Sequence, residues 1–330
     1  MHFTVLRFAP IIAYPKAHRI DQMLADFEWP FLTKDPDRRR IMTITRTFPK
    51  AESDKLPEGI SIQPRKFTFG SLESEPKYWL GNSKIATHFE NMFSLAIPPG
   101  ERFFIRSVQR YEDQITDPEH KGLIKAFILQ EGLHRSAHNE FNSSLEKHGV
   151  NVERETTFFE KYIGFAERHM PSKIMLGVTA FAEHLTATGA HSLLDNPRQA
   201  ELYSPETLKF WQWHAVEELE HRAVAFDLLK VAKIGYFSRV FSALVSIYAL
   251  ILFGTIVFLR LMRDDPTKLT RKEIPNLLNV LRIMGVWPTT KMFLQYFKPG
   301  FHPWDIAPPQ GLENWYASNE TGDELTDTPA

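Results

Sequence analysis

One stretch constrains this chain more than any other: it reads WQWHAVEELEHRAVAFD, from Trp211 to Asp227. Successive side chains of a helix turn by about 100°, so His214, Glu218 and His221 fall within a wedge of roughly 60°. The residues around them are mostly apolar, and a charged group among core residues must be paired, protonated or bound to a metal. Glu-x-x-His on an inward helix face is the half-site of di-metal carboxylate bundles. The stretch therefore predicts a buried helix that carries metal ligands.

A second half-site lies in residues 130–140, which read QEGLHRSAHNE. Glu131 and His134 repeat the i, i+3 spacing, which places them on one face of a helix. His138 lies one turn further along the same face. A single Glu-x-x-His is a weak signal because both residues are common in helices, but two of them are what a four-helix di-metal site needs.

Such a site also needs one carboxylate from each of two further helices. The candidates are Glu101, in PPGERFFIRSV, and Glu183, in TAFAEHLTA. Taken alone, Glu101 is better explained as an anion at a helix N-terminus. Together with the two half-sites, however, it completes the order Glu, Glu-x-x-His, Glu, Glu-x-x-His along the chain. Four separate segments in this order favour metal binding.

The depth of these residues along their helices selects the same four carboxylates. Antiparallel neighbours reach the same level when they lie equally far from the turn that joins them. At 1.5 Å per residue, Glu101 and Glu131 both lie about 20 Å from their turn. Glu183 and Glu218 lie roughly 18–21 Å from theirs. We therefore expect all four carboxylates to meet at one level of a helical bundle.

Capping and helix-breaking residues divide the chain into helices. Asp117-Pro118 and Ser204-Pro205 are each an N-cap residue followed by proline at the first helical position. The Pro-Pro-Gly at 98–100 is expected to end one helix, so that Glu101 opens the next. The expected helices cover roughly residues 83–95, 101–114, 118–148, 153–168, 171–194 and 205–232.

The C-terminal part contains an apolar run. Val240–Leu259 carries no charge, and twenty helical residues span about 30 Å, the hydrocarbon thickness of a bilayer. Asn276–Phe297 is a mixed apolar and basic helix of the kind that lies on a membrane surface. We expect a cytoplasmic protein that associates with a membrane through residues 240–259, with a buried core helix as the alternative. The polar, acidic tail from Gly311 is expected to be disordered.

Composition narrows the chemistry. The chain has no cysteine, so thiolate metal sites and cysteine nucleophiles are excluded, while 13 histidines allow a site of nitrogen and oxygen ligands. The net charge of −1 gives no indication of a nucleic-acid partner. MHFTVLRF and RRRIMTITRTF near the N-terminus read as short strands. The predicted organisation is an N-terminal extension (1–60), a di-metal bundle (61–235), hydrophobic and amphipathic helices (236–310) and a disordered tail (311–330).

The arrangement resembles the ferritin-like di-iron carboxylate superfamily. The triplet His214-x3-Glu218-x2-His221 is similar to the p-aminobenzoate N-oxygenase branch, in which a third histidine joins the ligands. PPGERFF, QEGLHRSAH, EHLTA, WQWHAVEELEHRAVAFD and FHPWD resemble a bacterial family of predicted metal-dependent hydrolases over about residues 60–305. These resemblances imply an all-α, ferritin-like four-helix bundle with additional helices and an irregular N-terminal extension. The implied metal ligands are Glu101, Glu131, His134, Glu183, His214, Glu218 and His221; His138 has no counterpart and is an additional candidate.

The site predicts a di-iron oxidoreductase, although manganese and zinc also suit carboxylate and imidazole ligands. We expect two iron ions that activate O2 to oxidise a small apolar substrate, with an electron donor as partner. No catalytic residue beyond the metal site is expected. Hydrolysis by a water molecule that two metals activate is the alternative, and iron storage or a structural role is a third. Glu217 and Glu220 should lie off the metal face, either solvating the helix or hydrogen-bonding the ligands, and His184 should point elsewhere.

Overall fold

Helices make up most of the described part of the chain, which comprises residues 46–47, 51, 53, 55–72 and 74–319 of a computed structural model. The predicted all-α fold is confirmed. Among the described residues, the one ladder of strands is the short antiparallel pair β1 (Arg46–Thr47) and β2 (Arg65–Lys66). β1 lies within RRRIMTITRTF, whereas MHFTVLRF lies outside the described residues. The predicted domain boundaries stay predictions.

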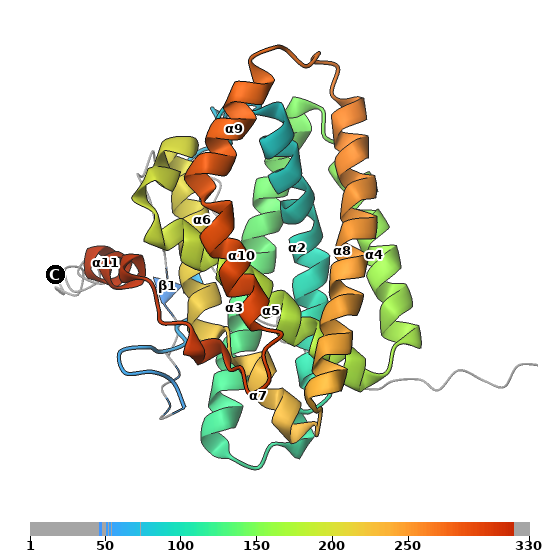
Figure 1. The fold of residues 1–330 in the computed structure, drawn as a ribbon, viewed down its shortest axis with the longest axis vertical. Coiled ribbons are helices and arrows are strands. Elements are labelled where there is room, and N and C mark those ends of the chain that lie inside the picture. The colour runs from blue at the N-terminus through green and yellow to red at the C-terminus, as the bar shows by residue number, and fades with distance from the viewer. Residues whose placement is uncertain (1–45, 48–50, 52, 54, 73, 320–330) are drawn as a thin grey trace, which may run out of the picture. The chain divides into compact units, whose positions relative to one another are not determined.

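Four helices form the central bundle (Figure 1): α2 (Lys84–Gln109), α3 (Pro118–Ser144), α5 (Ser172–Asp195) and α6 (Pro205–His221). α2 packs along α3, α5 packs along α6, and further contacts join α2 to α5 and α3 to α6. The predicted caps are present: Asp117 accepts a hydrogen bond from the Glu119 N–H, and Ser204 accepts one from the Thr207 N–H. A fifth helix, α4 (Val152–His169), packs on α2.

The predicted break at Pro98, Pro99 and Gly100 is wrong, because α2 runs through it without interruption. A proline inside a helix leaves the carbonyl four residues earlier without its N–H partner. Here the Ser94 carbonyl, which Pro98 cannot serve, accepts a hydrogen bond of 2.8 Å from the Asn142 side-chain amide of α3. Glu101 therefore lies in the middle of a long helix and not at its N-terminus.

The last helix predicted to carry candidate ligands is interrupted in the structure. The helix expected to reach about residue 232 ends at His221, and α7 (Val224–Val231) follows after a short break. At the break, Arg222 donates to the Ile306 carbonyl and lies 4.2 Å from the centre of the Trp304 ring. The ligand triplet lies wholly in α6, so the break leaves its shared face intact.

The C-terminal helices cover the bundle. α8 (Tyr236–Asp264) lies along α5 and α2. The single helix predicted for residues 276–297 is two, α9 (Glu273–Met284) and α10 (Val286–Gln295), because Gly285 adopts a left-handed φ of 66°. The expected disorder from Gly311 is wrong up to residue 319, since α11 (Gln310–Asn319) forms there. A side chain at Gly311 would collide with the Leu194 carbonyl, so glycine permits this approach.

Candidate metal centre

The side chains predicted as ligands meet in the middle of the bundle. None of them is more than 4% exposed. α2 supplies Glu101, α3 supplies Glu131, His134 and His138, α5 supplies Glu183, and α6 supplies His214, Glu218 and His221. The four carboxylates therefore lie at one level of the bundle, as their depth along the helices predicts.

The candidate donor atoms form four overlapping groups; two of them, Glu101 with His138 and His214, and His134 with His214 and Glu218, include His214, and the other two divide the carboxylates. In one, the donor atoms of Glu101, Glu131 and His134 all lie within 4.8 Å of one another. In the other, those of Glu131, Glu218 and His221 do so. A Glu183 oxygen lies 3.0 Å from His221 Nε2 and adds to the second group. Glu131 belongs to both of these groups and Glu218 lies 3.5 Å from His134 Nδ1, so these two carboxylates join the halves.

Each of two histidines is held by an outward hydrogen bond. His134 Nε2 lies 3.0 Å from a Glu217 oxygen, and His221 Nδ1 lies 2.9 Å from the Gln130 side-chain oxygen. Both partners are acceptors, so the bonded ring nitrogen carries the proton. In the neutral ring, the other nitrogen, Nδ1 of His134 and Nε2 of His221, then faces the carboxylates with a lone pair that could bind a metal. A partner of this kind fixes the tautomer of a metal-binding histidine.

His214 faces the site as well, and His138 lies behind it. His214 Nε2 is 2.7 Å from a Glu218 oxygen, while its Nδ1 is 2.7 Å from His138 Nε2. His138 Nδ1 lies 3.0 Å from the Ser94 hydroxyl, which donates to Asn142. Both ring nitrogens of His138 therefore have protein partners, whereas His214 directs one nitrogen at the carboxylates. This geometry makes His138 the weaker ligand candidate.

Behind the ligands lies a buried layer that sequence reasoning missed. Glu217 and Glu220 are fully buried, so their expected solvent exposure is wrong, although the hydrogen bond from Glu217 to His134 agrees with the other expectation. Arg65 donates from its backbone to Glu217 at 2.7 Å, and its guanidinium pairs with Glu220 at 2.8 Å. The Gln130 amide also donates to Glu220, at 2.8 Å. The two extra glutamates in EELEH were the available signal.

Other histidines near the predicted ligands lie outside the site. His184 follows Glu183 but faces away, as predicted, and its Nε2 lies 3.3 Å from the Phe293 carbonyl oxygen. His191, about two turns further along α5, lies 3.2 Å from the Ala307 carbonyl oxygen. Neither ring contributes to the cluster, and both attach the C-terminal segment to α5.

The inward atoms of the cluster fit a metal. Burying a polar atom without a hydrogen bond costs free energy, so such atoms are rare unless another partner serves them. Among the described residues, the buried side-chain atoms without a hydrogen bond include both carboxylate oxygens of Glu101, Glu131 and Glu183, together with His134 Nδ1 and His221 Nε2. His221 Nε2 lies at ion-pair distance from Glu183, 3.0 Å, and from Glu131, 3.2 Å. These atoms gather in one place and are all nitrogen or oxygen donors, a set that suits iron, manganese or zinc.

Burial and the charges of neighbouring groups shift the pKa of every carboxylate of the site. Burial raises the pKa of Glu101 and of Glu131 well above the ordinary range of a glutamate, and the negative charge of neighbouring carboxylates raises the pKa of both further. Burial also raises the pKa of Glu183 to about 7. Burial has the same tendency at Glu218, but His221 outweighs it and holds that pKa well below its usual value. Burial lowers the pKa of His221, yet Glu218 and Glu183 outweigh it and raise the pKa. The metal-free site therefore retains protons.

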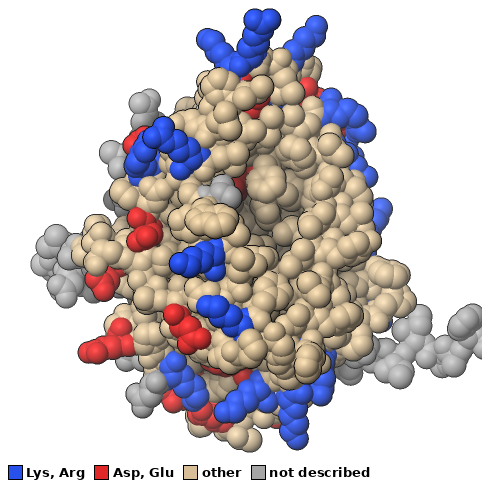
Figure 2. Space-filling view, viewed as in Figure 1, with Lys and Arg blue, Asp and Glu red and all other residues tan. Residues whose placement is uncertain are grey.

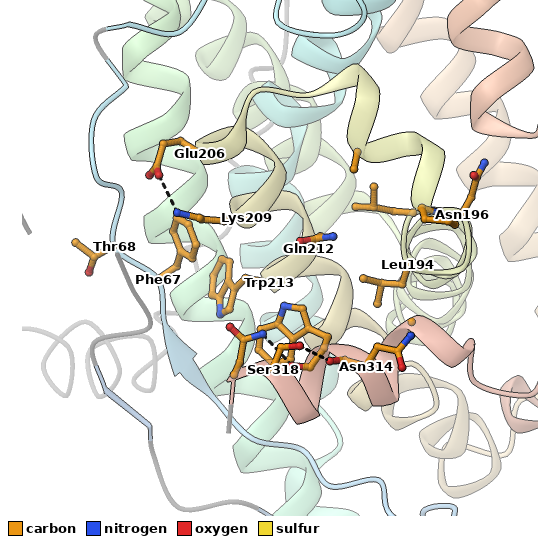
Figure 3. Close-up of a pocket in the computed structure, with 16 residues that line it drawn as sticks. Phe67, Thr68, Leu194, Asn196, Glu206, Lys209, Gln212, Trp213, Asn314 and Ser318 are labelled. Carbon is orange, nitrogen blue, oxygen red and sulfur yellow. Dashed lines mark hydrogen bonds and ion pairs between the residues drawn. The ribbon is translucent and has the colours of Figure 1, made fainter. Parts of the chain in front are cut away.

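Aromatic rings enclose the histidines. The Phe127 ring lies edge-on to His221 at 4.9 Å, and the Trp213 ring lies edge-on to His134 at 5.0 Å. Trp213 also lines a surface pocket of about 360 Å³, which Figure 3 shows between α5, α6, α11 and residues 67–68. The lining combines aromatic rings with polar side chains, among them Phe67, Trp315, Gln212, Asn314 and Ser318. One indole thus contacts both the pocket and the metal centre.

An all-α bundle with buried carboxylates and imidazoles at its centre defines a class of metal-binding helical proteins. Residues 63–307 match the family described as predicted metal-dependent hydrolase, and the chain belongs to that family. Neither a curated protein nor a solved structure matches the chain significantly. All predicted ligands lie in the matched region, and the family indicates a metal-dependent enzyme. This finding favours the hydrolytic alternative over O2-dependent oxidation.

Proposed function

We propose that the protein is a hydrolase whose reaction takes place at a pair of divalent metal ions in the bundle. The observation that carries the proposal is the set of buried donor atoms without hydrogen-bond partners at one point among four helices. Two divalent ions would bring four positive charges, which balance the four carboxylates of the site. Uncompensated buried charge is costly, so this balance supports two ions over one.

The donor groups would divide between the two ions. Glu101 and His134 would hold one ion, Glu183 and His221 the other, and Glu131 would serve both. Glu218 would be the second shared carboxylate, and His214 would add an imidazole on the side of His134. When bound, such ions supply Lewis-acid activation of water and of a carbonyl or phosphoryl group or, with iron, the electrons for O2 activation.

The surrounding residues prepare the site for this chemistry. Glu217 and Gln130 hold the tautomers of the ligand histidines, and this fixes the direction of their free nitrogens. The aromatic rings exclude bulk water, which strengthens electrostatic interactions at the centre. The pocket at Trp213 is the route that we propose for a substrate, because it reaches a ligand histidine through a single side chain.

O2-dependent oxidation by two iron ions is the second candidate. The feature that favours it is the origin of every donor on a helix, in the order Glu, Glu-x-x-His, Glu, Glu-x-x-His, as in di-iron carboxylate bundles. His214 supplies the third imidazole that resembles the N-oxygenase branch. The substrate would be small and apolar, and an electron donor would be needed.

Metal analysis combined with two assays separates these functions. The protein is loaded with zinc, manganese or iron, and metal content, hydrolysis of chromogenic carboxyl and phosphate esters, and O2 consumption with a reductant are measured. Hydrolysis with zinc or manganese, lost in Glu131→Gln and kept in the control Glu140→Gln, supports the hydrolase. Iron-specific O2 consumption without hydrolysis supports the oxidase. Equal metal content in Glu131→Gln and the wild type contradicts both.

A further inference from the structure

Large exposed apolar side chains gather on the C-terminal helices. We call the following set the apolar face: Phe237, Phe241, Leu244, Tyr248, Ile251, Leu252 and Leu259 of α8, Ile274, Leu278 and Leu281 of α9, and Trp287 and Leu294 of α10. Each of these side chains is at least 39% exposed, and Phe237 and Trp287 exceed 80%. Large apolar side chains exposed in such number on neighbouring segments of the chain mark an interaction site.

The exposed residues of α8 form one stripe. Phe237, Phe241, Leu244, Tyr248 and Ile251 follow one another at steps of four, three, four and three residues, which is the period of a helix face. With Leu259 the stripe runs from residue 237 to residue 259, a length of about 33 Å.

The opposite side of α8 carries small residues and packs against the bundle. Ser242, Ala243 and Gly254 are buried there. A side chain at Gly177 of α5 would collide with Ser242, so the two helices are in close contact. α8 therefore presents one face to protein and the other to its surroundings.

The packing of α8 against the bundle argues against a membrane-spanning α8. By length and composition α8 could cross a bilayer, and only 22% of its most apolar window is buried in the protein, so it is not a buried core helix. Its contacts, however, hold it against the bundle. α2 and α5, which hold the metal ligands, run beside it. Arg260 of α8 also pairs with the buried Glu155 of α4 at 3.2 Å. A spanning α8 would have to leave these contacts, whereas a helix lying flat in the interface would keep them.

The charge of the segment suits an anionic surface. Residues 236–300 contain nine Lys and Arg but three Asp and Glu, although the whole chain is nearly neutral. Glu273 is buried, and Asp265 pairs with Lys77 at 2.7 Å. Asp264, the third acidic residue, pairs with Arg263 at 2.8 Å. The other exposed cations lie beside the apolar face: Lys268, Arg271, Lys272, Arg282, Lys291 and Lys298. Figure 2 shows a largely uncharged surface over α8, with Lys and Arg at its upper edge.

We propose that the apolar face and these cations dock the protein into one leaflet of a membrane that contains anionic phospholipids, with α8 in the plane of the interface. Apolar side chains enter the boundary between headgroups and acyl chains, and the cations contact lipid phosphates. This mode specifies how the membrane association expected from the sequence would occur, and it differs from a spanning helix and from the buried core helix. It does not depend on the reaction at the metal centre.

Co-sedimentation of the metal-loaded, full-length protein with vesicles tests the proposal. We expect binding to vesicles of equal parts phosphatidylglycerol and phosphatidylcholine, weaker binding to phosphatidylcholine alone, and release by high salt. Phe241→Ser/Ile251→Ser should weaken binding about tenfold or more for each side chain. Phe241→Leu/Ile251→Leu keeps the apolar area and should bind like the wild type, which separates membrane docking from damage to the fold.

The charge requirement has its own variants. Lys268→Glu/Arg271→Glu/Lys272→Glu should weaken binding on the order of fivefold for each cation removed. Lys121→Glu/Lys125→Glu on the exposed side of α3 is the control and should leave binding unchanged, and unchanged metal content verifies folding in every variant. Protein that stays in the supernatant with both kinds of vesicle overturns the proposal. Resistance to extraction by alkaline carbonate would instead indicate a spanning helix, and a dimer that Phe241→Ser dissociates would indicate a second copy on this face.

Discussion

Loading the centre with two divalent ions should release about four protons at about pH 6. In the metal-free protein, burial raises the pKa of Glu101 and Glu131 well above its usual value and that of Glu183 to about 7. Glu218 and Glu183 raise the pKa of His221 in spite of its burial. Three carboxyls and one imidazole therefore hold protons. Metal ligands must be ionised carboxylates and neutral imidazoles, so these protons leave on binding.

The sign of the pH dependence follows from this count. Because the metal-free folded state holds the protons, low pH competes with the metal and apparent affinity rises with pH. Each proton released corresponds to a tenfold change in the binding constant per pH unit. Above about pH 7 the Glu183 carboxyl has already ionised, and the number should fall to about three.

Calorimetric titration in two buffers of different ionisation enthalpy measures the number of protons directly. Glu131→Gln, which replaces a shared carboxylate by an amide that takes up no proton, should release about one proton fewer and bind less metal. Glu140→Gln, on the exposed side of the same helix, should match the wild type. Release of less than about one proton at this pH, or an identical count in Glu131→Gln, would refute the assignment of these carboxyls as buried ligands.

Three further predictions concern the surroundings of the centre. His214→Ala should lower the metal content, measured by mass spectrometry, more than His138→Ala does. His138→Ala should weaken metal affinity by roughly 10–100-fold, because His138 acts through His214. Burial raises the pKa of Glu90 to about 7, so this group favours the fold most at low pH and its contribution is lost as pH rises through 7. Relative to Glu90→Gln, the wild type should lose roughly 2–3 kcal/mol of unfolding free energy between about pH 5 and 8, measured with denaturant; a parallel pH profile for the two proteins would contradict this. Asn142→Ala should cost about 1–3 kcal/mol in the same assay because it leaves the buried α2 carbonyl that it serves without a donor; a loss below about 0.5 kcal/mol would show that α2 tolerates its prolines unaided.

The convergence of the candidate ligands could be predicted from the sequence because their arrangement is governed by local geometry. Glu131 and His134, like Glu218 and His221, share a helix face through a period that depends only on the backbone. N-cap residues and prolines place the helix starts, and the starts set the depth of each carboxylate. These rules act within one helix or across one turn, so they require no knowledge of distant contacts.

Contacts between distant segments decided the rest. Arg65 reaches Glu217 and Glu220 across more than 150 residues of sequence, so the periodicity of α6 could not reveal that both glutamates are buried and paired. The prolines of α2 read as a break until Asn142, 48 residues from Ser94, supplies the missing hydrogen bond. The same limit applies to α8: its apolar length follows from sequence, but which of its faces is covered depends on helices that precede it by more than 40 residues. The backbone of a helix has the same geometry on every side, so only packing against other segments decides which side is buried.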